Sequence, residues 1–152
     1  EYEGHILNYI GDSIMVVFGA PQKLKDHENQ AINCALKMKK ILGELNSQWD
    51  ENKLSRYWKN HGINAITMRT GIHTGSVIAG NIGSPEMLQY STIGDTVNVA
   101  SRIEQANKEF NTEISFSHEI YTALEEKLFG ESKLSGEITL KGRTKPTKVY
   151  SI

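Results

Sequence analysis

The chain has 152 residues, of which 38% are hydrophobic and 23% are charged, with a formal net charge of −1. This length suits one domain with its own core, and the near-neutral charge gives no reason to expect nucleic acid as a partner. No apolar run reaches the roughly 20 residues of a membrane span, and the single cysteine, Cys34, excludes an internal disulfide. We therefore expect a cytoplasmic domain, and membrane attachment of a longer protein stays open.

The first third of the sequence predicts a β-hairpin followed by a helix. Two β-favouring runs, 5–10 and 14–18, are joined by Gly11-Asp12-Ser13, and a Gly-Asp pair in this position is a hairpin signal. From 26 to about 45, apolar residues recur at three- and four-residue spacing, which predicts an amphipathic helix. Its expected buried stripe comprises Ala31, Cys34, Ala35, Met38, Ile41, Leu42 and Leu45. Residues 47–64 show no clean period and are interpreted as a helix end plus a loop.

The remaining sequence alternates between strand-like and helix-like segments. The expected elements, in order, are strands at 65–73 and 76–82, a turn at 83–86, a helix at 95–107, a strand at 113–116, a short helix through 124 capped by Ser117, and closing strands at 134–141 and 147–152. On the 95–107 helix, Val99, Ile103 and Ala106 share one face. This order predicts a single α+β domain, an α/β sandwich with a largely antiparallel sheet and its helices on one face.

Asp12 is the first candidate for chemistry. A carboxylate at the tip of a tight hairpin is exposed by the turn and held in place by the flanking strands. Mg²⁺ usually takes only one or two protein carboxylates and leaves its other positions to water and phosphates. The alternative is that Asp12 is there because aspartate suits a turn.

The second candidate site is the pair Asn98 and Arg102 on the predicted 95–107 helix. Residues four apart project from the same helical face one turn apart, and this face differs from the apolar one. An amide beside a guanidinium can orient a ribose and neutralise charge that builds on a phosphate. The alternative is a solvated polar face. The sequence carries no Walker A, HExxH or CxxC pattern.

Three segments, taken together, resemble the signatures of the class III nucleotidyl cyclases, in the family's order. They are Tyr-Ile-Gly-Asp-Ser-Ile-Met-Val-Val-Phe-Gly-Ala-Pro at 9–21, Arg-Thr-Gly-Ile-His-Thr-Gly at 69–75, and Ile-Gly-Asp-Thr-Val-Asn-Val-Ala-Ser-Arg-Ile-Glu at 93–104. Leu140-Lys141-Gly142 and the later Val149-Tyr150 are similar to the family's C-terminal hairpin. The resemblance covers nearly the whole chain and implies an adenylyl or guanylyl cyclase catalytic domain.

The resemblance implies a role for each matching residue. Asp12 matches the second of two aspartates that bind Mg²⁺ or Mn²⁺, with two ions per site in the complete domain. Asn98 matches the asparagine that orients the ribose, and Arg102 matches the arginine that stabilises the transition state. Arg69 and Lys141 lie where the family has cations that bind the triphosphate of the nucleoside triphosphate substrate.

The family's fold is ferredoxin-like, and its catalytic domains work as head-to-tail homodimers with each site at the interface. The first metal aspartate of the family would precede residue 1, so residues 1–152 are expected to be the catalytic domain without its first strand and the helices that follow. We therefore expect this chain alone to be inactive. A regulatory domain upstream in the full-length protein is also expected, since the family's domains are commonly fused to one.

The residues that would read the base are Asn8 and Ser91. Adenylyl cyclases of the family usually have a lysine at the position of Asn8, and guanylyl cyclases have a glutamate. Ser91 suits the bacterial adenylyl type, and an amide at residue 8 can face either purine, because it both donates and accepts. The favoured function is conversion of ATP to 3′,5′-cyclic AMP. The alternatives are a guanylate cyclase, or a degenerate cyclase-like module that binds a nucleotide or only dimerises.

Overall fold

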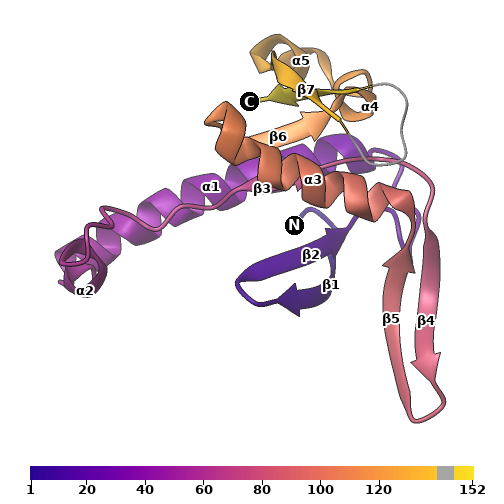
Figure 1. Cartoon of the computed structure of the whole chain (residues 1–152), viewed down its shortest axis with the longest axis horizontal. Helices are drawn as coiled ribbons and strands as arrows, with labels where there is room; N and C mark the ends of the chain where they lie inside the picture. The colour runs from indigo at the N-terminus through magenta and orange to yellow at the C-terminus, as the bar shows by residue number, and fades with distance from the viewer. Residues whose placement is uncertain (140–145) are drawn as a thin grey trace.

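The structure is a computed structural model that describes residues 1–139 and 146–152. It is a mixed α+β fold, as expected (Figure 1). The elements, in chain order, are β1 (His5–Ile10), β2 (Ser13–Val17), α1 (His27–Glu51), α2 (Arg56–Lys59), β3 (Thr70–Ile72), β4 (Ile78–Ser84), β5 (Met87–Ile93), α3 (Asp95–Phe110), β6 (Ile114–Ser117), α4 (His118–Tyr121), α5 (Glu126–Glu131), β7 (Lys133–Ile138) and β8 (Thr147–Ser151). Within the described ranges, no helix has the length and apolar character needed to cross a membrane.

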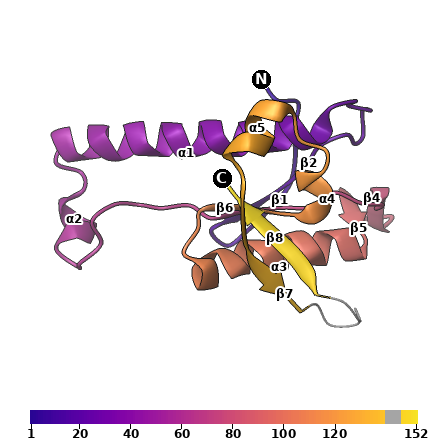
Figure 2. The same ribbon diagram turned by 90° about the horizontal axis from the view of Figure 1, so that it is seen from above.

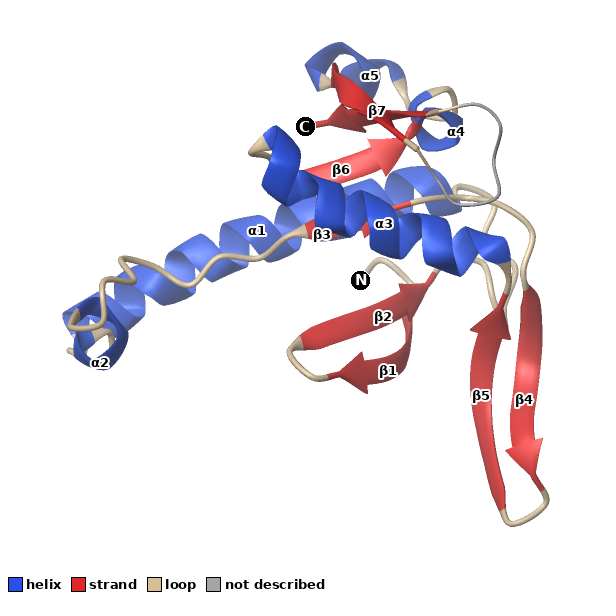
Figure 3. Cartoon of the chain, viewed as in Figure 1, coloured by secondary structure: helices blue, strands red, loops and turns tan. Residues whose placement is uncertain are grey.

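The central sheet has four strands in the order β3-β6-β8-β7. Figure 3 shows its strands β3, β6 and β7 in red among the blue helices. β3 runs parallel to β6, whereas β8 is antiparallel to both of its neighbours. The fully buried β6 contributes Phe116 directly opposite Tyr150 of β8. The predicted, largely antiparallel character of the sheet is therefore confirmed, with β3–β6 as the parallel pair.

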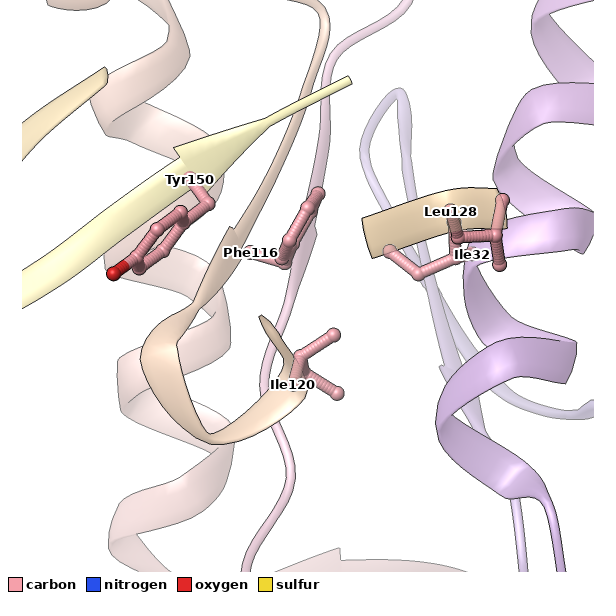
Figure 4. Packing of buried hydrophobic residues seen from close by; sticks show 5 residues of the cluster. All are labelled: Ile32, Phe116, Ile120, Leu128 and Tyr150. Carbon is pink, nitrogen blue, oxygen red and sulfur yellow. The ribbon is translucent and has the colours of Figure 1, made fainter. Parts of the chain in front are cut away.

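Both faces of this sheet are covered by helices. Successive residues of β8 point to opposite faces, so neighbouring residues pack against different helices. Val149 packs with Val99 and Ile103 of α3, whereas Tyr150 belongs to a cluster that also includes Phe116 (Figure 4). The helical members of that second cluster are Ile32 of α1, Ile120 of α4 and Leu128 of α5. Seen from above, β6 and β8 lie between α1 and α3 (Figure 2). The expectation of helices on one face is therefore wrong. The apolar residues of α3 cover one face of the sheet, and α1, α4 and α5 cover the other.

Two hairpins form sheets of their own, β1–β2 and β4–β5. The first was expected from Gly11-Asp12-Ser13, and its turn puts Gly11 at φ 62°, a left-handed conformation that glycine adopts without a steric penalty. The second was not predicted: β4 continues to Ser84, so the expected turn at 83–86 is formed only by Pro85 and Glu86, and the chain then returns as β5, which the sequence analysis did not assign. Both hairpins expose large apolar side chains, among them Tyr9, Ile10, Ile14, Ile78, Met87, Leu88 and Ile93.

Helix α1 continues six residues beyond its predicted end at 45. Its first half is buried at Ala31, Ile32 and Ala35, but Met38 and Ile41 of the expected stripe are exposed. The error has a physical cause: the apolar period continues along the helix, whereas the rest of the chain covers only its beginning. In Figure 1 the far end of α1 and the short α2 extend away from the sheet.

Smaller differences concern the ends of elements. The strand expected at 65–73 is formed only over Thr70–Ile72, and α5 was not predicted. The Ser117 cap is confirmed, since its hydroxyl accepts a hydrogen bond from the backbone N–H of Ile120. The closing strands are confirmed as β7 and β8, and the end of the predicted 134–141 strand lies outside the described residues.

Candidate active site

Helix α3 holds the Asn98 and Arg102 pair at the surface. Val99 and Ile103 are almost completely buried against the sheet, which fixes the rotation of the helix about its axis. Asn98 and Arg102 are therefore exposed, one turn apart on another face. Arg102 Nη1 donates to Gln105 Oε1 at 3.4 Å, a long contact that a ligand can replace easily. The predicted exposure of both side chains agrees with this structure.

The position of α3 is set by close contact with β3. A Cβ atom on Gly71 would lie 2.4 Å from the carbonyl oxygen of Ala100 and 2.2 Å from the backbone nitrogen of Glu104, so only glycine fits here. The buried Asn107 donates to the carbonyl of Thr70 at 3.0 Å. This hydrogen bond joins the C-terminal end of α3 to the same strand. The sequence around 69–75 thus serves to seat the helix that carries Asn98 and Arg102.

Strands β1 and β5 meet at Asn8, the first of the two candidate base-reading residues. Gln89 of β5 lies beside Asn8 of β1: its Nε2 donates to Asn8 Oδ1 and lies 3.4 Å from the carbonyl oxygen of Leu7. Ser91 is two residues further along β5, on the same side of that strand as Gln89. Asn8 and Ser91 are both partly buried, which suits groups that contact a ligand yet stay in fixed positions.

Gln89 was missed by the sequence analysis because β5 was not assigned. A signal was present: Met87–Ile93 is a β-favouring run that follows Ser84-Pro85-Glu86, a typical turn between paired strands. The partner of Gln89 could not be read from the sequence, since Asn8 lies 81 residues earlier in the chain.

Asp12 lies exposed in the β1–β2 turn, next to Gly11. Among the described residues there is no group of three or more histidine, cysteine, aspartate or glutamate side chains that could hold a metal ion. An exposed carboxylate is a chemically suitable ligand for Mg²⁺ or Mn²⁺, but it is one ligand of several that such an ion needs. Figures 1 and 2 both show this turn pointing away from the β4–β5 hairpin.

Of the two candidate triphosphate-binding cations, only Arg69 is among the residues that the structure describes. Arg69 Nε forms an ion pair with Glu104 Oε1 at 3.1 Å, and both side chains remain partly exposed. Glu104 is on α3 but about 140° around the helix from the Asn98–Arg102 face, at 100° per residue. Lys141 lies outside the described residues. The structure thus places Asn98 next to Arg102, and Asn8 next to Gln89, which is two residues before Ser91 on β5, whereas Asp12 and Arg69 are on other parts of the surface.

Comparison with known proteins identifies the family. Residues 2–152 match the model of the adenylate and guanylate cyclase catalytic domain. Adenylate cyclase 1 of Rhizobium meliloti (strain 1021) is 31% identical over 151 residues, which cover 99% of this chain and 21% of that protein. The chain belongs to the adenylate and guanylate cyclase catalytic domain family. The resemblance of the three sequence segments is therefore confirmed.

Solved structures of both substrate types share the fold. The guanylyl cyclase Cya2 matches with a TM-score of 0.76 and 29% identity, over 99% of this chain and 70% of that one. The adenylyl cyclase CyaB from P. aeruginosa matches with a TM-score of 0.75 and 30% identity, over 99% of this chain and 71% of that one. The family is thus established at the level of a cyclase catalytic domain, and both substrate types occur among its relatives.

Proposed function

We propose that this chain is part of an adenylate cyclase catalytic domain, which converts ATP to 3′,5′-cyclic AMP and pyrophosphate. The observation that carries the proposal is the exposed Asn98–Arg102 pair on a helix whose neighbouring face is buried. Such a pair has a fixed direction and free hydrogen-bonding capacity, as a site for ribose and phosphate requires.

In this reaction the ribose 3′-oxygen loses its proton and attacks the α-phosphorus. The bond from the α-phosphorus to the oxygen that bridges to the β-phosphorus breaks, and pyrophosphate leaves. The Asn98 amide would hold the ribose, and the Arg102 guanidinium would stabilise the charge on the α-phosphoryl oxygens. Arg69 and Lys141 are the proposed triphosphate contacts. For Arg69 this means leaving Glu104, at a cost of at most about 1 kcal/mol for an exposed ion pair.

Mg²⁺ or Mn²⁺ is the proposed cofactor, and it would supply charge neutralisation at the phosphates and a lower pKa for the 3′-hydroxyl. Asp12 provides one carboxylate for it from the exposed β1–β2 turn. Further ligands are expected from the nucleotide and from sequence upstream of this domain, as the family's first metal aspartate implies. On this proposal the 152 residues do not form a working site by themselves.

A homodimer is the proposed working unit. Within one copy, the turn that carries Asp12 points away from the β4–β5 hairpin, beside which α3 begins (Figure 1). Two copies arranged head to tail would bring the Asp12 turn of one to the Asn98–Arg102 face of the other. The exposed apolar residues of both hairpins, such as Ile10 of β1 and Met87 of β5, provide surface for such an association.

At the base site, Ser91 favours ATP, and the amide of Asn8 is compatible with either purine. The alternative within the family is a guanylate cyclase, which the likeness to guanylyl cyclase Cya2 favours. The chain spans about a fifth of the Rhizobium meliloti relative, so regulation by other segments of a longer protein is also part of this proposal.

The test is cyclic nucleotide production by the full-length protein, with Mn²⁺ and either ATP or GTP. Cyclic AMP is the expected product, and Arg102→Ala should lower kcat by about 10²–10³-fold, as the loss of a transition-state donor does. Lys108→Ala is the matched control, because Lys108 is an exposed cation near the other end of the same helix. It should leave kcat within about twofold.

Other outcomes separate the alternatives. Cyclic GMP from GTP, without cyclic AMP from ATP, would show a guanylate cyclase and keep the roles of Asn98 and Arg102. A folded dimer that makes neither product would exclude catalysis and leave a module that binds a nucleotide or only dimerises.

A further inference from the structure

We propose that residues 52–63, which include α2, form a contact for the surface of an anionic lipid bilayer. This segment is named the α2 tip. The inference goes beyond the proposed function and is independent of it, because none of the candidate cyclase residues lies in the α2 tip.

The α2 tip projects from the molecule and is held firmly by the end of α1. Figures 1 and 2 show α2 at one end of the molecule and the β4–β5 hairpin at the other. The rings of Trp49 and Trp58 meet edge to face, with their centroids 5.7 Å apart. The backbone N–H of Leu54 donates to the carbonyl of Trp49 at 2.8 Å, and that of Ile63 donates to the carbonyl of Trp58 at 3.0 Å. These contacts fix the direction in which the α2 tip points.

The α2 tip exposes three large apolar side chains. Tyr57 is 75% exposed, Leu54 59% and Ile63 48%. Single exposed apolar residues are ordinary on a protein surface, but these three lie within ten consecutive residues. An exposed tyrosine, with its apolar ring and polar hydroxyl, suits the boundary between lipid headgroups and acyl chains.

The charged residues of the α2 tip are all positive. They are Lys53, Arg56 and Lys59, and each is exposed. The acidic residues Asp50 and Glu51 precede them at the end of α1, and Asp50 pairs with Lys59 at 2.7 Å. Even with both carboxylates included, this end of the molecule is net positive, whereas the whole chain carries a charge of −1. An anionic surface therefore attracts this end and repels the remainder, which sets the direction of approach.

A lipid surface matches the apolar and the charged side chains together. Nucleic acid would use the cations and the tyrosine ring, but it offers no apolar partner to Leu54 and Ile63. A protein partner would need a hollow shaped to the projecting α2 tip, whereas a bilayer yields to an inserted side chain. Lysine and arginine at such a boundary keep their charges among the headgroup phosphates while their stems lie in apolar surroundings.

The experiment measures co-sedimentation of the 152-residue chain with phosphatidylcholine vesicles that contain or lack the anionic lipid phosphatidylglycerol. Binding is expected to the anionic vesicles and should weaken as salt is added. The double variant Lys53→Gln, Arg56→Gln should bind them about 25-fold more weakly, because each cation near such a surface contributes about fivefold. The matched control is Lys108→Gln, Lys127→Gln, which removes the same charge from exposed positions on α3 and α5. It should change binding by less than about twofold.

Leu54→Ala tests the apolar part of the contact. It should weaken binding about tenfold, since the leucine side chain is lost from the acyl boundary. Leu134→Ala is the matched control, because Leu134 of β7 is 55% exposed, and it should have no effect. Trp49 and Trp58 are the only tryptophans of the chain, so its tryptophan emission reports on the α2 tip. The emission should shift to shorter wavelength with anionic vesicles and be quenched by brominated acyl chains.

Several results would overturn the inference. They are no binding to anionic vesicles, equal binding to both kinds of vesicle, or equal losses in the α2 tip variants and their controls. An emission shift with double-stranded DNA but none with vesicles would also overturn it and would identify a nucleic-acid contact instead. Circular dichroism of each variant verifies its fold, which the exposed positions of all the substitutions should preserve. None of these measurements depends on cyclic nucleotide production, so they stand whether or not the proposed function fails.

Discussion

The four-stranded body of the domain and its two hairpins differ in how they are held together. In the body, both faces of β3-β6-β8-β7 are covered, and Phe116, Ile103 and Val149 have no exposed surface. The hairpins β1–β2 and β4–β5 are two-stranded, and Ile78 and Met87 are more than 70% exposed. A two-stranded hairpin is marginally stable by itself, so these depend on the body and on each other.

The candidate site residues are divided between the two regions in an informative way. Asn8, Asp12 and Ser91 are on the hairpins, whereas Asn98 and Arg102 are on a helix packed on the body. The groups proposed to stabilise the transition state thus have the most rigid support. We infer that changes in the body alter stability first, and that changes in the hairpins alter activity first.

The largest effect on stability is expected for Phe116→Ala. Phe116 is completely buried between β8 and the helices on that face, and its truncation leaves a cavity. Loss of such a side chain typically costs about 3–5 kcal/mol in the free energy of unfolding. Ile78→Ala, at a residue 75% exposed, should cost less than about 0.5 kcal/mol. Urea denaturation of both variants tests the contrast, and similar losses would contradict it.

The reverse pattern is expected for Asp12→Asn. The substitution keeps the size of the side chain in the exposed turn, so the melting temperature should not change. Activity of the full-length protein should fall about a hundredfold or more, because one metal-binding charge is lost. Asp50→Asn is the control, since Asp50 is an exposed carboxylate in an ion pair with Lys59. Equal activity of Asp12→Asn and the control would exclude a metal role for Asp12.

Gly71→Ala tests the contact between β3 and α3. The added Cβ would lie 2.2 Å from the backbone nitrogen of Glu104, so the helix must move. We expect a loss of about 1–3 kcal/mol, together with reduced activity, because Asn98 and Arg102 move with α3. Gly43→Ala is the matched control in the exposed part of α1, where a Cβ meets nothing within 4 Å. It should stabilise the protein by about 0.5–1 kcal/mol. Similar denaturation midpoints for the two variants would contradict this account.

The sequence predicted those features of the fold and the site that depend on local patterns. The Gly-Asp turn, the buried stripe of Val99, Ile103 and Ala106, and the exposed Asn98–Arg102 face each follow from the spacing of neighbouring residues. The contact of Gln89 with Asn8 joins residues 81 apart, and no local pattern contains it.

The incomplete burial of α1 also shows what a local sequence pattern leaves open. Its apolar period predicts a buried stripe at Met38 and Ile41, but burial depends on what the remaining chain places over the helix. Periodicity determines which face is apolar and leaves open how far along the helix that face is covered.

Cys34 provides the smallest test, at the point where α1 leaves the body. Burial raises the pKa of the Cys34 thiol, so the folded state favours the neutral form. The resulting stabilisation is complete below the unfolded-state pKa, about 8.5, and is lost as the pH rises through the higher folded-state pKa. Alkylation by iodoacetamide at pH 8 should therefore be slower in the folded protein than in urea, because less thiolate is present. Cys34→Ala should remove this part of the alkaline loss of stability. Equal alkylation rates in the folded and unfolded states would contradict this account. The part of α1 that the body covers would then end before Cys34, earlier than the buried Ala35 indicates.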